Sequence, residues 1–226
     1  AGNTPFRDWK RSCYQGGIAD PLIIHWPETI KDQGSIRNQY HHVTDLLPTV
    51  LEALDIGPPE SISGVQQSDI EGVSMWYSIT DRTAESRKKI QYYEMLGARA
   101  IYYDGWKAVA DHEALSSTGN FNNDRWALFY LPDDPNETND LSEVHPEIVR
   151  DLVDRWWIEA GRYKVLPLDD RGYERWPDPR PVVSPPRDVY EYFPNTQPVF
   201  GRGAANTVNR DFDIVATITP NANGLT

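Results

Sequence analysis

The sequence predicts a mixed α/β fold, in which the end of an α/β domain is followed by a small α+β unit and a proline-rich tail. Three observations predict it. The apolar run 21–26 is bounded by prolines and is typical of a strand buried on both faces. Alternating apolar segments between 90 and 131 are typical of antiparallel strands, with a hairpin signal at Asp104 and Gly105. Prolines then concentrate in 166–200, where little periodicity remains.

Composition excludes several classes of partner. The 226 residues include 34 acidic side chains and 22 lysines and arginines, which gives a formal net charge of −12. This balance argues against nucleic-acid binding, which needs a basic surface, and against docking on anionic membranes. No apolar run approaches the ~18 residues of a membrane span. With Cys13 as its one cysteine, the chain cannot form an intrachain disulfide or a cysteine metal cluster.

The first part of the chain, 1–85, is expected to hold the buried strand and one clear helix. Apolar residues repeat at intervals of three and four between 43 and 54, which predicts an amphipathic helix. Asp45 and Pro48 suit its first turn. A second, short helix is expected over 73–79.

The second part, 86–165, is expected to be an antiparallel sheet with one helix. The predicted strands are 90–96, 98–103, 106–110 and 126–131, and the predicted helix is 146–163. Four tryptophans are expected in the core of this unit, namely Trp106, Trp126, Trp156 and Trp157. Arg99 and Lys107 on the hairpin are interpreted as structural ion partners rather than ligands.

The third part, 166–226, reads as an extended arm that leads into a strand. Residues 212–219 alternate between apolar and polar with β-branched enrichment, and a turn follows them. The chain stops where a partner strand would begin, and a lone strand leaves its backbone groups unpaired. We therefore expect a piece of a longer protein, cut at both ends.

The candidate functional segment is the polar stretch 10–17, just before the apolar run. Gly16 and Gly17 allow the backbone to approach a ligand closely, and Lys10 offers a positive charge to an anion. The alternative is a surface loop with solvated basic residues.

Five motifs, in order along the chain, resemble the second half of the arylsulfatase family. A lysine precedes Tyr-Gln-Gly-Gly and then a Pro-Leu-Ile-Ile-His-Trp-Pro segment. His-Val-Thr-Asp-Leu-Leu-Pro-Thr, Gly-Ala-Arg-Ala with Gly-Trp-Lys, Trp-Ala-Leu-Phe, and Asp-Pro-Asn-Glu-Thr-Asn-Asp-Leu follow. These motifs occupy 10–27, 42–51, 97–107, 126–129 and 134–141. Gln15 stands where the family usually has Glu, so any ion pair made by that Glu would be lost.

The resemblance implies the C-terminal part of an alkaline-phosphatase-like sulfatase fold and the hydrolysis of sulfate monoesters. It also implies a formylglycine nucleophile and a calcium ion, both in the missing N-terminal half of the polypeptide. Cys13 lacks the Pro or Ala two positions on and the Arg four positions on that the modified cysteine requires. This chain is therefore expected to hold no metal ligands, and to be inactive and poorly soluble alone.

One site residue is carried over from the resemblance: Lys10 matches the lysine that contacts the sulfate oxygens. His41 and His42 are the next candidates, and His42 is taken as a substrate-binding candidate whose alternative is hydrogen bonding at the start of a helix. His25 is expected to pack within its strand, and His112 and His145 to be loop and helix-start residues. The pair Asp169 and Asp170 is interpreted as solvated rather than as a metal pair.

Two other functions remain open at this point. One is a phosphonate or phosphate monoester hydrolase of the same superfamily. The other is a non-catalytic carbohydrate-binding relative, in which Tyr190, Tyr192 and Phe193 would form a binding platform. The substrate alcohol is not readable from these residues, and the compartment stays open between periplasmic, extracellular and cytoplasmic.

Overall fold

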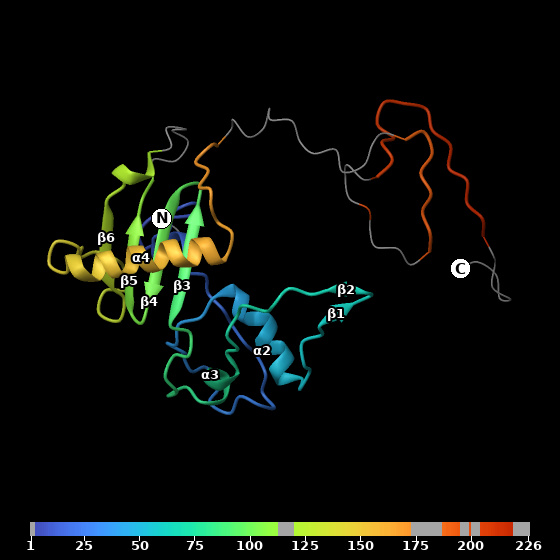
Figure 1. Ribbon diagram of the computed structural model, residues 1–226. Coiled ribbons are helices and arrows are strands. Elements are labelled where there is room, and N and C mark those ends of the chain that lie inside the picture. Colours follow the sequence, from blue (N-terminus) through green and yellow to red (C-terminus); the bar gives the residue numbers. More distant parts are fainter. Residues whose placement is uncertain (1–2, 113–119, 173–186, 195–198, 200–203, 219–226) are drawn as a thin grey trace. The chain divides into compact units, whose positions relative to one another are not determined.

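The computed structural model describes residues 3–112, 120–172, 187–194, 199 and 204–218. The chain divides into two units, Ala1–Arg175 and Trp176–Thr226 (Figure 1). None of the helices in the described ranges has the length and apolar character needed to cross a membrane.

The centre of the first unit is a four-stranded antiparallel sheet in the order β3-β4-β5-β6. Its strands are β3 (Ile90–Met95), β4 (Ala98–Tyr103), β5 (Trp106–Ala110) and β6 (Trp126–Tyr130), each within one residue of the predicted bounds. Asp104 and Gly105 both have positive φ, 46° and 92°, as the tight hairpin turn between β4 and β5 requires. The local alternation of apolar residues therefore predicted this sheet correctly.

Both faces of the sheet are covered. Helix α4 (Pro146–Arg162) crosses one face, where its Leu152, Trp156 and Ala160 pack on residues of β4, β5 and β6 (Figure 1). On the opposite face, the N-terminal residues Cys13 and Tyr14 pack on a second core cluster, formed by Ala98, Ala100, Val109 and Phe129. The sheet thus fixes the segment that carries Lys10 to the face away from α4.

The expected tryptophan core is confirmed only in part. Trp156 is fully buried, and its indole N–H donates to the Tyr93 carbonyl at 3.1 Å. Trp106 and Trp126 are half-buried against the same cluster. Trp157 is exposed, because it lies on the solvent side of α4 next to the buried stripe.

The apolar run 21–26 does not form a strand, and this prediction was wrong for the described chain. The segment is extended without strand hydrogen bonds, Ile23 is 89% exposed and His25 is exposed rather than packed. An extended segment becomes a strand only when another strand accepts and donates its backbone hydrogen bonds. None of the described strands pairs with this segment.

Several short elements precede β3 in the chain. They are α1 (Gln15–Ile18), η1 (Val43–Asp45), α2 (Leu46–Ala53), the two-stranded hairpin β1 (Ser61–Ile62) and β2 (Val65–Gln66), and α3 (Trp76–Thr80). The helix predicted over 43–54 is confirmed, and α3 lies where a short helix was expected. The periodic apolar residues of this helical segment are nevertheless exposed: Val43, Leu46, Leu47, Val50 and Leu54.

The predicted strand 212–219 does not form in its described part. Residues 211–218 carry no strand hydrogen bonds, and Ile214 and Val215 are 83% and 94% exposed. The reason is the same as for 21–26, since no described strand lies alongside. Tyr192 and Phe193 are exposed as expected, whereas Tyr190 is half-buried. Much of the proline-rich arm, 173–186, lies outside the described residues.

Candidate functional site

Lys10 lies in a loop, 7–12, that folds back onto helix α1. The Gly16 N–H donates to the Arg7 carbonyl at 2.9 Å, and the Ser12 N–H donates to the Trp9 carbonyl at 3.1 Å. A Cβ at Gly16 would overlap the Arg7 carbonyl, and one at Gly17 would overlap the Ser12 carbonyl. The absence of a side chain at Gly16 and Gly17 therefore allows the backbone of the Lys10 loop to lie close to α1. The sequence had suggested instead that these glycines allow a ligand to approach the backbone.

The loop is held in an unfavourable backbone conformation on both sides of Lys10. Asp8 and Arg11 have φ values of 62° and 80°, a region that costs an L residue about 1–2 kcal/mol. The Asn3 side-chain amide donates to the Asp8 carbonyl at 3.1 Å and to the Gly16 carbonyl at 2.6 Å, which ties the loop to α1. Such local strain is concentrated at functional sites in folded proteins.

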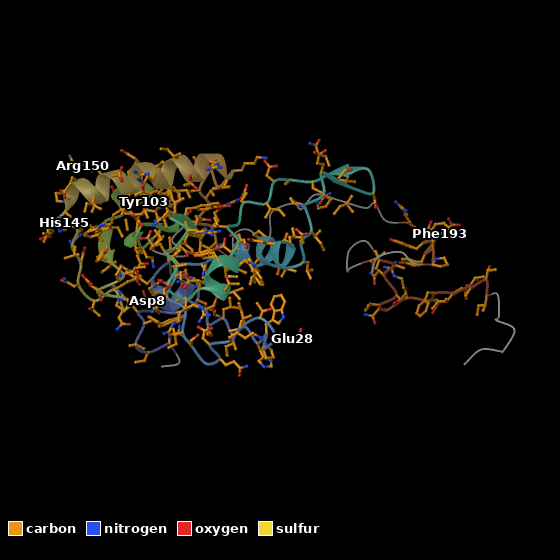
Figure 2. All side chains as sticks on the ribbon, turned by 90° about the horizontal axis from the view of Figure 1, so that it is seen from below. Asp8, Glu28, Tyr103, His145, Arg150 and Phe193 are labelled. Carbon is orange, nitrogen blue, oxygen red and sulfur yellow. The ribbon has the colours of Figure 1, made fainter. Side chains whose placement is uncertain are left out.

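Lys10 lines an open cavity of about 500 Å³. The walls come from the loop and from the end of the sheet: Asp8, Trp9, Lys10, Arg11, Ser12, Ala98, Asp111 and His112. Asp8 lies on the side of the sheet away from α4 (Figure 2). Partial burial raises the pKa of Asp111, and the Asp8 carboxylate adds to that rise. Lys10 is exposed, and within the described ranges no acceptor takes a hydrogen bond from its ammonium group.

A second cavity, of about 530 Å³, lies against the turn after β6. Its lining includes Asp133 and Asp134 but no lysine or arginine. It is therefore unsuited to a sulfate, and the cavity beside Lys10 is the better candidate for an anionic substrate.

The side chains of His112 and Asp170 are both buried, at 4% and 7% exposure, which corrects the prediction for Asp170, whereas His112 lies in a loop after β5 as expected. The His112 ring lies 2.9 Å from an Asp124 oxygen through Nδ1 and 3.2 Å from an Asp170 oxygen through Nε2. Asp124 also pairs with Arg99, as expected of a structural ion partner. Asp170 was expected to be solvated, but the fold places its carboxylate against the buried His112 ring. Nothing local in the sequence signals this contact, because its members lie 12 and 58 positions apart.

Lys107 forms a fully buried ion pair with Glu137. The Lys107 ammonium donates to Glu137 Oε1 at 2.7 Å, and burial lowers the pKa of Lys107 while the carboxylate opposes that shift. The other carboxylate oxygen accepts the backbone N–H of Gln15 at 2.6 Å. The expectation that Lys107 is an ion partner is confirmed, whereas the part played by Glu137 was missed.

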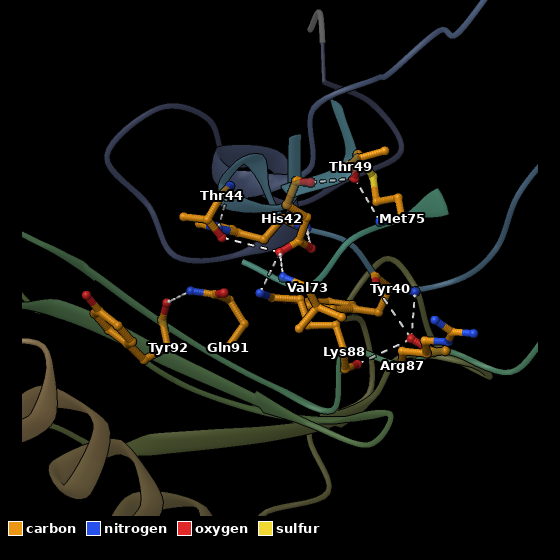
Figure 3. Close-up of polar contacts among 12 residues, drawn as sticks. Tyr40, His42, Thr44, Thr49, Val73, Met75, Arg87, Lys88, Gln91 and Tyr92 are labelled. Atoms are coloured by element: carbon orange, nitrogen blue, oxygen red, sulfur yellow. Dashed lines mark hydrogen bonds and ion pairs between the residues drawn. The ribbon is translucent and has the colours of Figure 1, made fainter. Parts of the chain in front are cut away.

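His42 caps the helical segment that begins with η1. Its ring nitrogen accepts a hydrogen bond from the backbone N–H of Thr44. The backbone N–H of His42 donates to the buried Asp45 carboxylate at 2.8 Å (Figure 3). Burial lowers the pKa of His42, and Lys88 adds to that effect. The capping alternative is thus confirmed. His42 is not among the residues that line the cavity beside Lys10, and its role in substrate binding stays a prediction.

Asp45 is the centre of the network around His42. Besides the His42 N–H, its fully buried carboxylate accepts the Val73 N–H and the Lys88 ammonium, both at 2.9 Å. Thr49 extends the network, since its hydroxyl donates to the Asp45 carbonyl and accepts the Met75 N–H at 2.8 Å (Figure 3). These contacts join α2, the segment before α3 and the approach to β3.

The described residues do not fit either cofactor that the resemblance implies. Among them, no group of three or more His, Cys, Asp or Glu side chains could hold a metal ion. Cys13 is buried in the core, and burial raises its thiol pKa to about 12. A thiol in this state forms almost no thiolate at neutral pH and acts as a packing residue.

Comparison with known families decides the class of protein. The family model described as N-sulphoglucosamine sulphohydrolase, C-terminal, matches residues 5–157, which is more than half of the chain. The chain belongs to the sulfatase family. The match corresponds to the C-terminal part of these hydrolases, in agreement with the motifs and with the mixed α/β fold.

Curated relatives are about a quarter identical to this chain over the regions that match. An uncharacterized sulfatase of Schizosaccharomyces pombe is 27% identical over 173 residues, covering 75% of this chain and 30% of the relative. An N-acetylgalactosamine-6-O-sulfatase of Bacteroides thetaiotaomicron is 27% identical over 161 residues, covering 67% and 30%. The chain therefore spans less than a third of the length of these two relatives.

The fold is also found in solved structures. The crystal structure of Ps i-CgsB in complex with k-i-k-neocarrahexaose superimposes with a TM-score of 0.58 at 20% identity, covering 77% of this chain and 36% of that chain. At this identity the likeness supports the fold and not a shared substrate.

Proposed function

We propose that the protein to which this chain belongs hydrolyses sulfate monoesters as an arylsulfatase does, and that Lys10 is the sulfate-binding group of this chain. Membership of the sulfatase family supports the reaction class. One observation supports a sulfate-binding role for Lys10. Its exposed ammonium group lies on the wall of an open cavity, in a loop fixed by α1 and the sheet.

Lys10 would act by charge and position. An ammonium group makes short, charge-assisted hydrogen bonds with the oxygens of a sulfate, and these are roughly twice as strong as neutral ones. A fixed donor that needs no reorganisation during the reaction stabilises charge as it develops in the transition state. The strained and doubly anchored backbone around Lys10 supports such a fixed position.

The formylglycine and the calcium ion of the family would come from another part of the same polypeptide. When bound, they would supply the nucleophile and a Lewis acid. The chain itself contributes the anion-binding lysine and its scaffold, and we expect it to be inactive alone.

The N-terminal part of the polypeptide is also the proposed partner of the exposed apolar surface. That surface comprises one face of α2 and the segment 21–26. An apolar stripe on an amphipathic helix faces a core in folded proteins, and large uncovered patches favour association. The length of the relatives, more than three times that of their matched region, leaves room for a domain that would cover it.

The test is the Lys10→Ala variant of the full-length protein, with Lys31→Ala as matched control. Both lysines are exposed, but Lys31 donates to the Glu28 carbonyl and lies outside the cavity. Loss of the sulfate contact is expected to lower kcat/KM on an aryl sulfate by about 10²–10³-fold. Equal activity of the two variants would refute the role of Lys10, and faster turnover of the matching aryl phosphate would favour the phosphatase alternative.

A further inference from the structure

The Glu137 carboxylate connects the sheet to the start of helix α1. One oxygen accepts the Lys107 ammonium from β5 at 2.7 Å, and the other accepts the Gln15 N–H at 2.6 Å. Glu137 and Lys107 are fully buried, and Gln15 precedes Glu137 by 122 positions. The contact therefore fixes a segment of the N-terminal part of this chain relative to the sheet.

The loop of Lys10 rests on the turn that Glu137 holds. Gly16, the residue after Gln15, donates its N–H to the Arg7 carbonyl at 2.9 Å and accepts the Asn3 side-chain amide at 2.6 Å. The Arg7 guanidinium lies 4.1 Å from the centre of the Tyr14 ring. At the other end of the loop, the Tyr14 N–H donates to the Ser12 hydroxyl at 3.1 Å. Both ends of the loop 7–12 thus contact residues 14–16, so a shift of Gln15 is expected to move the backbone that carries Lys10.

Stability alone gives little reason for a buried ion pair at this place. The desolvation of two charges offsets most of their attraction, and well-packed apolar replacements are often neutral or stabilising. A carboxylate that bonds two donors from distant segments does something an apolar pair cannot do, since it fixes their relative position. The buried pair of Glu137 and Lys107 has this geometry.

We propose that Glu137 is a positioning residue for sulfate binding, which acts through Gln15 and the loop 7–12 on Lys10. This inference rests on the proposed function of Lys10, but the holding of the loop by Glu137 can be measured without it. Glu137 itself does not line the cavity beside Lys10, so its effect is expected to depend on that lysine.

Two double variants of the full-length protein separate positioning from stability: Glu137→Gln with Lys107→Met, and Glu137→Leu with Lys107→Met. Both remove the two charges and keep similar side-chain volumes. Only the glutamine variant keeps an oxygen that can accept the Gln15 N–H. Hydrogen exchange of residues 7–17 is expected to be about tenfold faster in the leucine variant, because one anchoring hydrogen bond is lost.

The same pair is then compared in turnover of an aryl sulfate. The leucine variant is expected to have a kcat/KM about tenfold or more below that of the glutamine variant, because small displacements of a binding group are costly. In the Lys10→Ala background the two should differ by less than about twofold, since the group being positioned is gone.

Each outcome decides a separate point. Equal exchange of 7–17 in the two variants, or faster exchange with equal kcat/KM, overturns the inference. A loss that persists in the Lys10→Ala background shows a general structural role and overturns it as well. If the two double variants differ in exchange as expected but the parent protein hydrolyses no sulfate ester, the proposed function is refuted. The conclusion that Glu137 holds the loop then still stands.

If the leucine variant does not fold, Glu137→Asp with Lys107 retained gives the same test. A carboxylate shorter by one methylene keeps a charge for Lys107 but cannot reach both donors in the present geometry. Faster exchange of 7–17 and a lower kcat/KM are again expected, and parent-like values of both would overturn the inference.

Discussion

Lys88 and Lys89 are neighbours in the chain, and each ammonium lies 2.9 Å from an aspartate, yet their surroundings are opposite. Lys88 pairs with Asp45 in the interior, where both side chains are at most 5% exposed. Lys89 pairs with Asp104 in solvent, with both side chains at least half exposed. Equal distance therefore does not mean equal contribution to stability.

Lys88→Met is expected to destabilise the protein strongly, and Lys89→Met to leave it close to the parent. Removing Lys88 leaves the Asp45 carboxylate buried without its cation, which costs about 3–5 kcal/mol. The exposed pair is screened by solvent and contributes little. Thermal unfolding of the two variants of the full-length protein checks this, and equal midpoints would contradict it.

Gly16→Ala is expected to lower both stability and sulfate turnover. The new methyl group would overlap the Arg7 carbonyl, so the loop of Lys10 must move. Gly161→Ala is the matched control, because it lies in α4 with no atom within 4 Å of the added Cβ. Alanine at that site should be neutral or stabilising by up to about 1 kcal/mol. Unchanged kcat/KM in Gly16→Ala would show that the loop tolerates displacement.

His42 is expected to make stability fall as the pH is lowered. Burial and the nearby Lys88 lower its pKa in the folded state, so the unfolded chain binds the proton more readily. Its contribution is present above the unfolded value of about 6.5 and is lost progressively below it. His42→Asn keeps a capping oxygen but cannot titrate. Its unfolding midpoint should fall less between pH 7.5 and 5.5 than that of the parent, and equal slopes would refute the role of His42.

How far the sequence predicts this molecule depends on whether the deciding contact is local. Strands β3 to β6 and helix α4 were predicted because alternation, turn residues and period are visible within each segment. The segment 21–26 has an equally clear pattern, but a strand is a relation between two segments, and its partner is not among the described strands.

In the candidate site, too, the sequence predicted the residue within a contiguous motif but not the contacts between distant segments. Lys10 was found through a motif that is contiguous in sequence. Of the partners that hold its loop, Lys107 was interpreted as an ion partner and Glu137 was missed. Neither could be connected to Gln15, which lies more than 90 positions away from both. The burial of Asp170 with His112 likewise depends on distant residues, and the proline-rich surroundings of Asp170 suggested a solvated carboxylate.

The exposed face of α2 leads to a prediction for this chain expressed alone and for the full-length protein. Leu47 and Val50 are both more than half exposed, on the stripe whose period predicted the helix. Replacing both with Glu should reduce aggregation of the 226-residue chain, because an uncovered apolar patch is removed. In the full-length protein the same change should lower the unfolding midpoint, since charges would be buried against the covering domain.

Arg150→Glu on α4 is the matched control for this pair of substitutions. It changes the net charge by the same amount at an exposed position that is already polar. We therefore expect it to affect neither the aggregation of the chain nor the midpoint of the full-length protein. If Leu47→Glu with Val50→Glu left the full-length midpoint at the control value, this face of α2 would be solvent-exposed in the whole protein. The proposal that the N-terminal part covers it would then be wrong.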